Sequence, residues 1–234
     1  MVRFSSQALG CTQTCLFGKN LCRLSQTTFR CEISTEDLDQ LLSSGLVERG
    51  DASGPGLHCF SVTEKSKARR RWIVHPSSQN EAFPELPTFS LLGITELISL
   101  TTSSHNYAFA STADIKCCFH QIELPASIRP YFGFVYNNST FRITSIPTGG
   151  NASPQIGHAI TFSVGAASLK MMKLQGTFFK NCIFYSRLMI TVYIDNIRAL
   201  GDSAAVEAFF LRFSLVCRSL DDAHQSAVEL CRAL

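Results

Sequence analysis

Two aspartates follow apolar runs with the composition of β-strands, and both could hold a divalent cation. Asp195 stands in Tyr193-Ile194-Asp195-Asn196, between an apolar run at 188–194 and a second one at 197–200. Two β-prone runs around a polar Asp-Asn pair predict a hairpin with a tight two-residue turn. Asp114 ends another predicted strand, 107–115. Carboxylates at such positions project out of the core, although most turn residues of this kind bind nothing.

Carboxylates on neighbouring strands suit phosphoryl transfer assisted by two metal ions. This chemistry needs two divalent cations about 3.5–4 Å apart. Mg²⁺ or Mn²⁺ prefers oxygen ligands, so Asp114 and Asp195 are candidate catalytic residues and metal ligands. The backbone carbonyl of Ile115 and the side chain of Asn196 are further candidate oxygen ligands. The adjacent thiols of Cys117 and Cys118 are soft ligands and fit these cations poorly.

A basic run lies between two other predicted strands, 58–62 and 71–74. It consists of Lys65, Lys67, Arg69, Arg70 and Arg71, five positive charges within seven residues. Runs of this kind usually belong to solvated loops. The net charge of the chain is only +3, which is too near balance to indicate nucleic-acid binding by itself.

Several helices and one further hairpin are predicted around these strands. Ser34 is a candidate N-cap for a helix that ends near Gly45, and residues 91–100 have helical spacing. Asn137-Asn138-Ser139 predicts a hairpin turn. A helix from Ser153-Pro154 to about 172 is expected to bury Ile156, Ile160, Val164, Ala167 and Met171. After Gly201-Asp202-Ser203, an amphipathic helix is expected to bury Val206, Phe209, Phe210, Phe213, Val216 and Leu220.

The composition predicts a folded, reduced protein. With 234 residues, 45% of them hydrophobic, the chain can form one large domain or two closely associated subdomains. No apolar run has the length of a membrane span, and no sustained apolar core marks a signal peptide. The ten cysteines contain no Cys-x-x-Cys pair. Reduced thiols and an intracellular location, in the cytoplasm or nucleus, are therefore expected, with no membrane partner.

Three segments, in their order and spacing, resemble motifs of the reverse transcriptase palm. Asp114 with Phe119 five positions later resembles motif A. Pro147-Thr148-Gly149, followed by Ser153-Pro154, resembles motif B, and Tyr193–Asn196 resembles motif C. The stretch 67–74 resembles the fingers strand that precedes motif A. The resemblance covers residues 35–220, and the motifs are most similar to those of tyrosine-recombinase retroelements, including VIPER-like ones.

The resemblance implies an α+β fold, with an antiparallel palm sheet packed on helices and partial fingers. It divides the chain into a loosely ordered N-terminal segment (1–33), a fingers-like region (34–113) and a palm (114–234). No thumb is expected, so the chain would be a fragment of a retroelement polyprotein or a remnant of one. The implied activity is RNA-directed DNA polymerisation, in which a primer 3′-hydroxyl attacks a dNTP on an RNA or DNA primer–template.

The resemblance also implies substrate-binding roles. Arg71, with help from Lys67, would bind the triphosphate, where a guanidinium can form two parallel hydrogen bonds. Phe119 would lie under the incoming sugar and leave no room for a 2′-hydroxyl. Gly149 would let the backbone approach the nucleotide closely.

The chain departs from the family pattern at three positions. Asn196 replaces the usual second aspartate of motif C, Thr148 replaces a glutamine, and Cys117 replaces a frequent aspartate. These departures leave two alternatives open. One is a catalytically dead remnant that binds nucleic acid. The other is an RNA-directed RNA polymerase palm, against which Phe119 argues.

Overall fold

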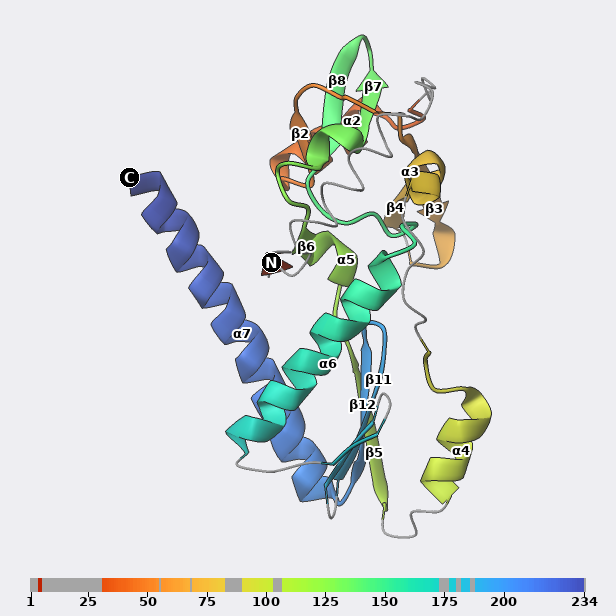
Figure 1. Ribbon diagram of the computed structural model, residues 1–234, viewed down its shortest axis with the longest axis vertical. Helices are drawn as coiled ribbons and strands as arrows, with labels where there is room; N and C mark the ends of the chain where they lie inside the picture. The colour runs from red at the N-terminus through yellow and green to blue at the C-terminus, as the bar shows by residue number, and fades with distance from the viewer. Residues whose placement is uncertain are drawn as a thin grey trace. The chain divides into compact units, whose positions relative to one another are not determined.

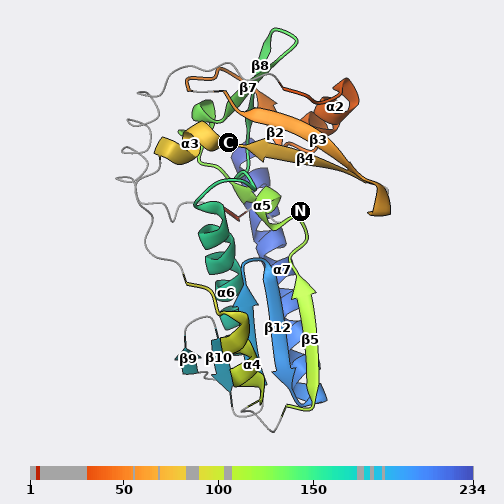
Figure 2. The ribbon, with the colours of Figure 1, turned by 90° about the vertical axis from the view of Figure 1, so that its right-hand side faces the viewer.

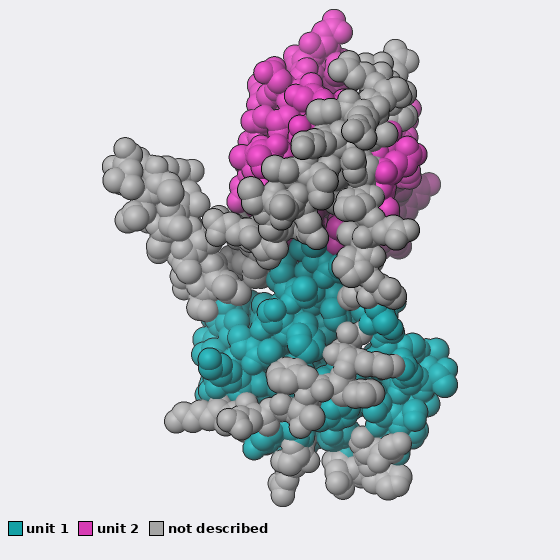
Figure 3. Space-filling view, in the orientation of Figure 1, with its two compact units in different colours: residues 1–2, 88–118, 154–234 teal, residues 3–87, 119–153 magenta. Residues whose placement is uncertain are grey.

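The computed structural model describes residues 4–5, 31–54, 56–67, 69–82, 90–102, 107–172, 177–179, 182–185 and 188–233. Contacts divide the chain into two units, each assembled from separate segments (Figure 3). Unit 1 contains residues 1–2, 88–118 and 154–234, and unit 2 contains residues 3–87 and 119–153. Helices and mainly antiparallel sheets build both units, which confirms the α+β prediction. The division into an N-terminal segment (1–33), a fingers-like region (34–113) and a palm (114–234) stays a prediction.

Unit 1 is built on a five-stranded antiparallel sheet (Figure 2). Its strand order is β5 (Phe109–Asp114), β12 (Asn196–Gly201), β11 (Leu188–Tyr193), β10 (Cys182–Tyr185) and β9 (Thr177–Phe179). Residues 188–192 of β11 are all buried, as expected for a strand covered on both faces. The predicted strand ending at Asp114 is β5, which lies at one edge of the sheet.

Helices cover both faces of this sheet (Figure 1). Helices α6 (Ser153–Met171) and α7 (Ser203–Ala233) lie on one face, and α4 (Ile94–Thr102) lies on the other. The carboxylate of Asp202 accepts a hydrogen bond of 2.8 Å from the Ala205 N–H and so caps α7. The predicted apolar face of α7 is buried at Val206, Phe209, Phe213 and Val216. Among the described residues, no helix is long and apolar enough to cross a membrane.

The buried face of α6 differs from the prediction. Of the five residues expected to be buried, only Val164 is fully buried, whereas Ala167 and Met171 are exposed. The face that packs consists mainly of small and polar residues at helical spacing: Gly157, His158, Thr161, Val164, Gly165, Ser168 and Leu169. Hydrophobic periodicity selects large apolar residues and therefore predicts the wrong face here.

Two properties allow this small-residue face of α6 to be buried. The hydroxyls of Thr161 and Ser168 donate to backbone carbonyls one turn earlier, at 2.9 and 2.7 Å, so neither is left without an acceptor. A Cβ atom at Gly165 would lie 3.0 Å from Cδ1 of Ile197. The glycine therefore permits a closer approach of α6 to β12 than a larger residue would.

Unit 2 contains a three-stranded antiparallel sheet and a separate hairpin. The sheet order is β2 (Val47–Arg49), β8 (Ser139–Ile143) and β7 (Gly133–Tyr136). Asn137 and Asn138 join β7 to β8 with positive φ values of 46° and 59°, as a type I′ turn requires. The second hairpin pairs β3 (His58–Glu64) with β4 (Arg69–His75), and the short helix η1 (Lys65–Lys67) joins them.

Short helices complete unit 2: α2 (Thr35–Ser43), α3 (Ser77–Ala82), η2 (Arg129–Tyr131) and α5 (Cys118–Gln121), whose first residue is the last of the unit 1 segment. Ser34 caps α2 in a capping box with Asp37, as its sequence predicts. Helix α3 is absent from the sequence-based prediction because the prolines around it indicate a broken chain. Within the predicted N-terminal segment 1–33, β1 (Phe4–Ser5) pairs with β6 (Ile122–Glu123), and Glu32 pairs with Phe60. Residues 6–30 lie outside the described part of the chain.

Candidate active site

Strand pairing in unit 1 brings the two predicted catalytic aspartates together. Asp114, the last residue of β5, is directly opposite Asn196, the first residue of β12. The Ile115 N–H donates to the backbone carbonyl of Asp195 at 3.0 Å. A backbone hydrogen bond therefore connects the residue after β5 to the residue before β12. The structure thus places Asp114, Ile115, Asp195 and Asn196 at one end of the sheet.

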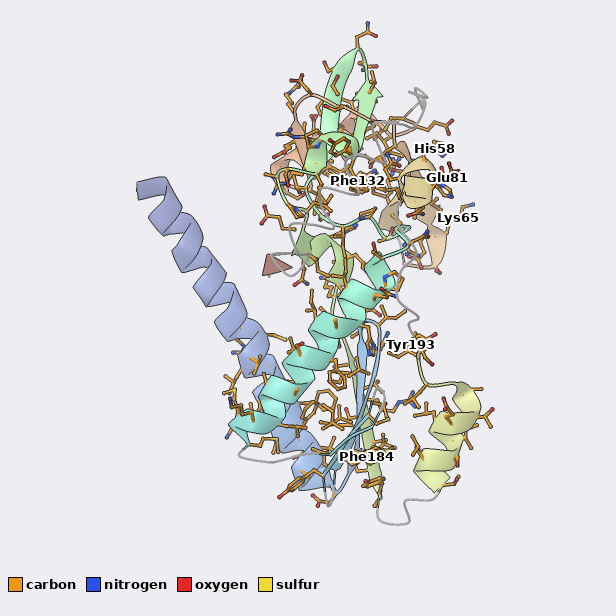
Figure 4. The ribbon with its side chains drawn as sticks, in the orientation of Figure 1. His58, Lys65, Glu81, Phe132, Phe184 and Tyr193 are labelled. Atoms are coloured by element: carbon orange, nitrogen blue, oxygen red, sulfur yellow. The ribbon has the colours of Figure 1, made fainter. Side chains whose placement is uncertain are left out.

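The turn that carries Asp195 is displaced by one residue from the prediction. Tyr193 pairs with Asn196, so the two-residue turn is Ile194-Asp195 instead of Asp195-Asn196. Ile194 has a φ of 57°, a left-handed conformation that is unfavourable for a β-branched residue. Figure 4 labels Tyr193 at the end of β11 where this turn begins, and this residue is 54% exposed.

His158 of α6 stabilises this unfavourable turn. The Ile194 N–H donates to Nδ1 of His158 at 3.3 Å, and His158 is buried. Nδ1 of the imidazole is the acceptor in this contact. His158 therefore positions the backbone on which Asp195 lies. The sequence contains no local signal for this role, since residues 158 and 194 meet only through packing of α6 on the sheet.

The aspartate side chains create a negative local potential. Desolvation and then the neighbouring Asp195 carboxylate raise the pKa of Asp114 above its ordinary value, although Asp114 as a whole is exposed. Burial, followed by the charges of Asp195 and Asp114, raises the pKa of the Cys118 thiol to about 12. The thiol of Cys118 is therefore protonated at neutral pH. The Asp195 carboxylate is close enough to disfavour the ionisation of Asp114, and a cation would stabilise the charge at such a place.

The side chains at this end of the sheet fit a hard cation only in part. Asp114 and Asp195 provide charged oxygens, but the described residues contain no group of three or more His, Cys, Asp or Glu placed to hold a metal ion. The Ile115 carbonyl accepts the Cys118 N–H at 3.1 Å, which leaves its second lone pair for a ligand. Asn196 donates its amide to Oδ1 of Asp195 at 3.1 Å, and its own carbonyl oxygen is neutral. The ligand types suit Mg²⁺, with less negative charge than three carboxylates would supply.

Four of the predicted site residues, Lys67, Arg71, Phe119 and Gly149, belong to unit 2. The β3–β4 hairpin buries the cross-strand pair Cys59 and Val74 on one face. On the opposite face, Val62 and Arg71 form a cross-strand pair and both are exposed. Lys67 ends η1, and its side chain lies outside the described part. Arg71 is thus a charged side chain available to a ligand.

Arg70 differs from its neighbour Arg71. Its guanidinium lies 2.7 Å from the carboxylate of Asp37, the residue that completes the capping box of α2. Asp37 is mostly buried, with 12% of its side chain exposed, so this pair connects β4 to α2. One of the five charges in the basic run is therefore already paired within the protein.

We expect Arg71→Ala to reduce the salt dependence of nucleic-acid binding more than Arg70→Ala does. Each lost phosphate contact lowers the slope of log affinity against log salt by about 1, whereas Arg70 is already neutralised by Asp37. Filter binding of single-stranded DNA at several salt concentrations measures both slopes, and circular dichroism checks that α2 survives in Arg70→Ala. Equal slopes for Arg71→Ala and the unmodified chain would mean that Arg71 contacts no phosphate and belongs to a solvated loop.

Gly149 lies in a loop held by α3. A Cβ atom on Gly149 would lie 3.0 Å from the Val74 carbonyl, so the close approach at this glycine is to β4. The Gly149 carbonyl accepts the side-chain amide of Asn80 at 3.0 Å, and the Asn80 carbonyl oxygen accepts the Asn151 N–H at 2.9 Å. Asn80 thus fixes both sides of the loop that resembles motif B. Sequence reasoning missed Asn80 because it missed α3. Phe119 lies in α5 and is half-buried.

Comparison with solved structures identifies the fold. The chain is similar to a selenomethionine-labelled CSH mutant of the prototype foamy virus protease–reverse transcriptase, with a TM-score of 0.59 and 14% sequence identity, over 84% of this chain and 24% of that chain. It is also similar to foamy viral protease–reverse transcriptase in complex with dsDNA, with a TM-score of 0.58 and 16% identity, over 83% of this chain and 38% of that chain.

The chain has a reverse-transcriptase-like fold. A third similar structure, the foamy viral enzyme with an RNA/DNA hybrid, gives a TM-score of 0.57 at 15% identity, over 83% of this chain and 25% of that chain. The chain spans between 24% and 38% of the length of these three matched chains. No protein-family model matches the sequence, and the comparison with curated proteins gives no match.

The reverse-transcriptase-like fold that the resemblance implies is confirmed. The assignment to tyrosine-recombinase retroelements stays a prediction, as do the roles of the individual residues. The geometry of unit 1 gives a physical reason why Asp114 and Asp195, which are far apart in the sequence, lie close together. The β5–β12 pairing joins residues from distant segments in one small cluster at the end of the sheet.

Proposed function

We propose that this chain belongs to an RNA-directed DNA polymerase and contributes the site of nucleotidyl transfer. The observation that carries the proposal is the pairing of β5 with β12, which brings Asp114 and the Asp195 turn together. In this proposal unit 1 is the palm and unit 2 is a part of the fingers. The similarity of the fold to structures solved with dsDNA and an RNA/DNA hybrid supports a primer–template as the partner.

Asp114 and Asp195 would hold two divalent cations, Mg²⁺ or Mn²⁺, with the Ile115 carbonyl and the Asn196 amide oxygen as additional ligands. Such ions, when bound, stabilise the charge on the attacking and leaving oxygens of an in-line displacement. The hydrogen bonds from Ile115 and Ile194 hold the backbone of the Asp195 turn while ligands are exchanged. A fixed backbone keeps the carboxylates in position without further reorganisation during reaction.

Residues of unit 2 would bind the nucleotide. Arg71, with Lys67, would bind the triphosphate of a dNTP through charge-assisted hydrogen bonds, for which the exposure of Arg71 is favourable. Phe119 would exclude a 2′-hydroxyl. Gly149 would keep the backbone of its loop accessible to the nucleotide. The wider setting that we propose is an intracellular retroelement polyprotein of the tyrosine-recombinase type.

A second candidate function is nucleic-acid binding without catalysis. Asn196 favours it, because its amide donates a hydrogen bond to Asp195 and so occupies a carboxylate oxygen that a cation would need. A neutral residue at this position also lowers the charge available to two cations. Nucleic acid would then bind through the exposed positive charges of unit 2, among them Arg71.

The test of the proposed function is single-nucleotide incorporation on an RNA template with a DNA primer. We expect incorporation of dNTP that depends on Mg²⁺ or Mn²⁺ and stops when EDTA removes the metal. A preference for rNTP would favour an RNA polymerase, and Phe119→Val should shift the chain toward rNTP. Binding of the primer–template without incorporation at any metal concentration would favour the second candidate.

A further inference from the structure

Two cysteines of unit 2 lie opposite each other on adjacent strands. Glu32 forms a parallel bridge with Phe60, and the Glu32 N–H donates to the Cys59 carbonyl at 2.8 Å. The residue before Glu32 is therefore opposite the residue before Phe60, which places Cys31 opposite Cys59. Directly opposed residues of paired strands point to the same face. The register alone thus brings the two thiols together.

The spacing of paired strands is compatible with a disulfide. Neighbouring strands lie about 4.7–4.9 Å apart, within the range of about 4.4–6.8 Å between Cα atoms that a disulfide spans. Both residues are free thiols in this structure, and a hydrogen bond joins their side chains. Little backbone movement is needed to bring the sulfur atoms to bonding distance.

The two thiols have different environments. Cys59 is fully buried on β3, whereas Cys31 is partly exposed. The hydrogen bond from Cys59 lowers the pKa of the Cys31 thiol. The same hydrogen bond, together with burial, raises the pKa of Cys59. Cys31 is therefore the accessible nucleophile, and Cys59 is a protected thiol directly beside it.

We propose that Cys31 and Cys59 form a redox site that a small-molecule disulfide of the glutathione type converts reversibly to an intramolecular disulfide. The Cys31 thiolate attacks one sulfur of the oxidant, forms a mixed disulfide and releases one thiol. The sulfur of Cys59 then attacks the Cys31 sulfur and releases the second thiol. The two protons of the protein thiols are carried away by the two thiols released.

The other buried cysteines in the described part of the chain, Cys118 and Cys182, lack this arrangement. Burial raises the pKa of Cys182 to about 11 and contributes to the value of about 12 at Cys118. Both are buried thiols with little thiolate at neutral pH, so they are matched internal controls for Cys31. The disulfide would join the segment at 31–33 to β3, the strand paired with the one that carries Arg71. Oxidation would therefore restrain β3, the strand of this hairpin that pairs with Glu32.

The test is disulfide mapping of the full chain after native incubation with oxidised glutathione. Free thiols are then blocked, and peptides are analysed by mass spectrometry without reduction. We expect a Cys31–Cys59 peptide that disappears on reduction and still forms in the control variant Cys182→Ser. Before oxidation, Cys31 of the unmodified chain should react with iodoacetamide at least about 10-fold faster than Cys182.

Variants and unfolding separate the possible outcomes. Cys59→Ser should leave Cys31 as a mixed disulfide with glutathione, and Cys31→Ser should leave Cys59 reduced. In denaturant the preference of Cys31 for Cys59 should be lost, because the register that creates it is lost. The proposal is overturned if both thiols stay reduced in the native chain, or if Cys31 pairs predominantly with another cysteine. These outcomes are independent of any polymerase activity.

Discussion

We expect Asp195→Asn to reduce metal-dependent nucleotide incorporation by about 1,000-fold and to leave the fold intact. A unit charge about 4 Å from another contributes about 4 kcal/mol at a partly buried site, which corresponds to about three powers of ten in rate. The backbone carbonyl of Asp195 would still accept the Ile115 N–H, and an amide oxygen could still accept from Asn196. Single-turnover incorporation with a saturating primer–template measures the effect.

The matched control for Asp195→Asn is Glu207→Gln. Glu207 is an exposed residue of unit 1 near the start of α7, and its carboxylate accepts a hydrogen bond from the Ser203 hydroxyl. Glu207→Gln therefore removes the same charge as Asp195→Asn, but away from the Asp114–Asp195 pair. Its incorporation rate should equal that of the unmodified chain. Binding of Mn²⁺, followed by electron paramagnetic resonance, should weaken only in Asp195→Asn. An equal incorporation rate for both variants would mean that Asp195 takes no part in the reaction.

Asn196→Asp should have the second largest effect, in the opposite direction. A third carboxylate beside Asp114 and Asp195 adds negative charge where two divalent cations are proposed, and hard cations bind more tightly as ligand charge rises. We expect Mg²⁺ to bind about 100-fold more tightly. This is less than the factor of about 1,000 used for one unit charge above, because the three carboxylates repel one another. A Mg²⁺ titration of incorporation, compared with the unmodified chain, gives the change directly.

The same substitution should make stability depend on the metal. Without Mg²⁺, Asn196→Asp should lower the free energy of unfolding by about 1 kcal/mol through repulsion, and saturating Mg²⁺ should more than restore it. Asn138→Asp, in the exposed β7–β8 turn, adds the same charge away from the pair and should show no such recovery. If Asn196→Asp neither binds Mg²⁺ more tightly nor incorporates faster, nucleic-acid binding without catalysis becomes the better proposal.

Local signals predict most of the elements that position the candidate site. The apolar runs at 107–115, 188–194 and 197–200 become β5, β11 and β12, and the predicted cap Ser34 marks a true helix start, as does Gly201-Asp202-Ser203. The turn is displaced by one residue because Asp and Asn are common turn residues, whereas the register places the unfavourable φ on Ile194. Turn composition alone cannot show which two residues form the turn, because the strand register decides it.

Long-range contacts explain what the sequence does not reveal. The roles of His158 and Asn80 depend on packing between residues far apart in the chain, and neither has a local pattern. Likewise, the ion pair between Arg70 and Asp37 distinguishes Arg70 from the exposed Arg71, although the two are alike in sequence. Residue types and spacing predict that Asp114 and Asp195 lie at a strand end and a hairpin tip, because such places are visible in hydrophobic patterns.

The interleaved segments of the two units have a consequence for synthesis on the ribosome. Unit 2 is complete once residue 153 has emerged, since its last segment is 119–153. Strand β5 emerges earlier but cannot pair until β12 is made, because these two strands are neighbours in the sheet. Unit 2 can therefore fold first, while β5 waits as an unpaired edge that is open to wrong partners. Nascent chains released at successive lengths should then acquire protease resistance in unit 2 before unit 1.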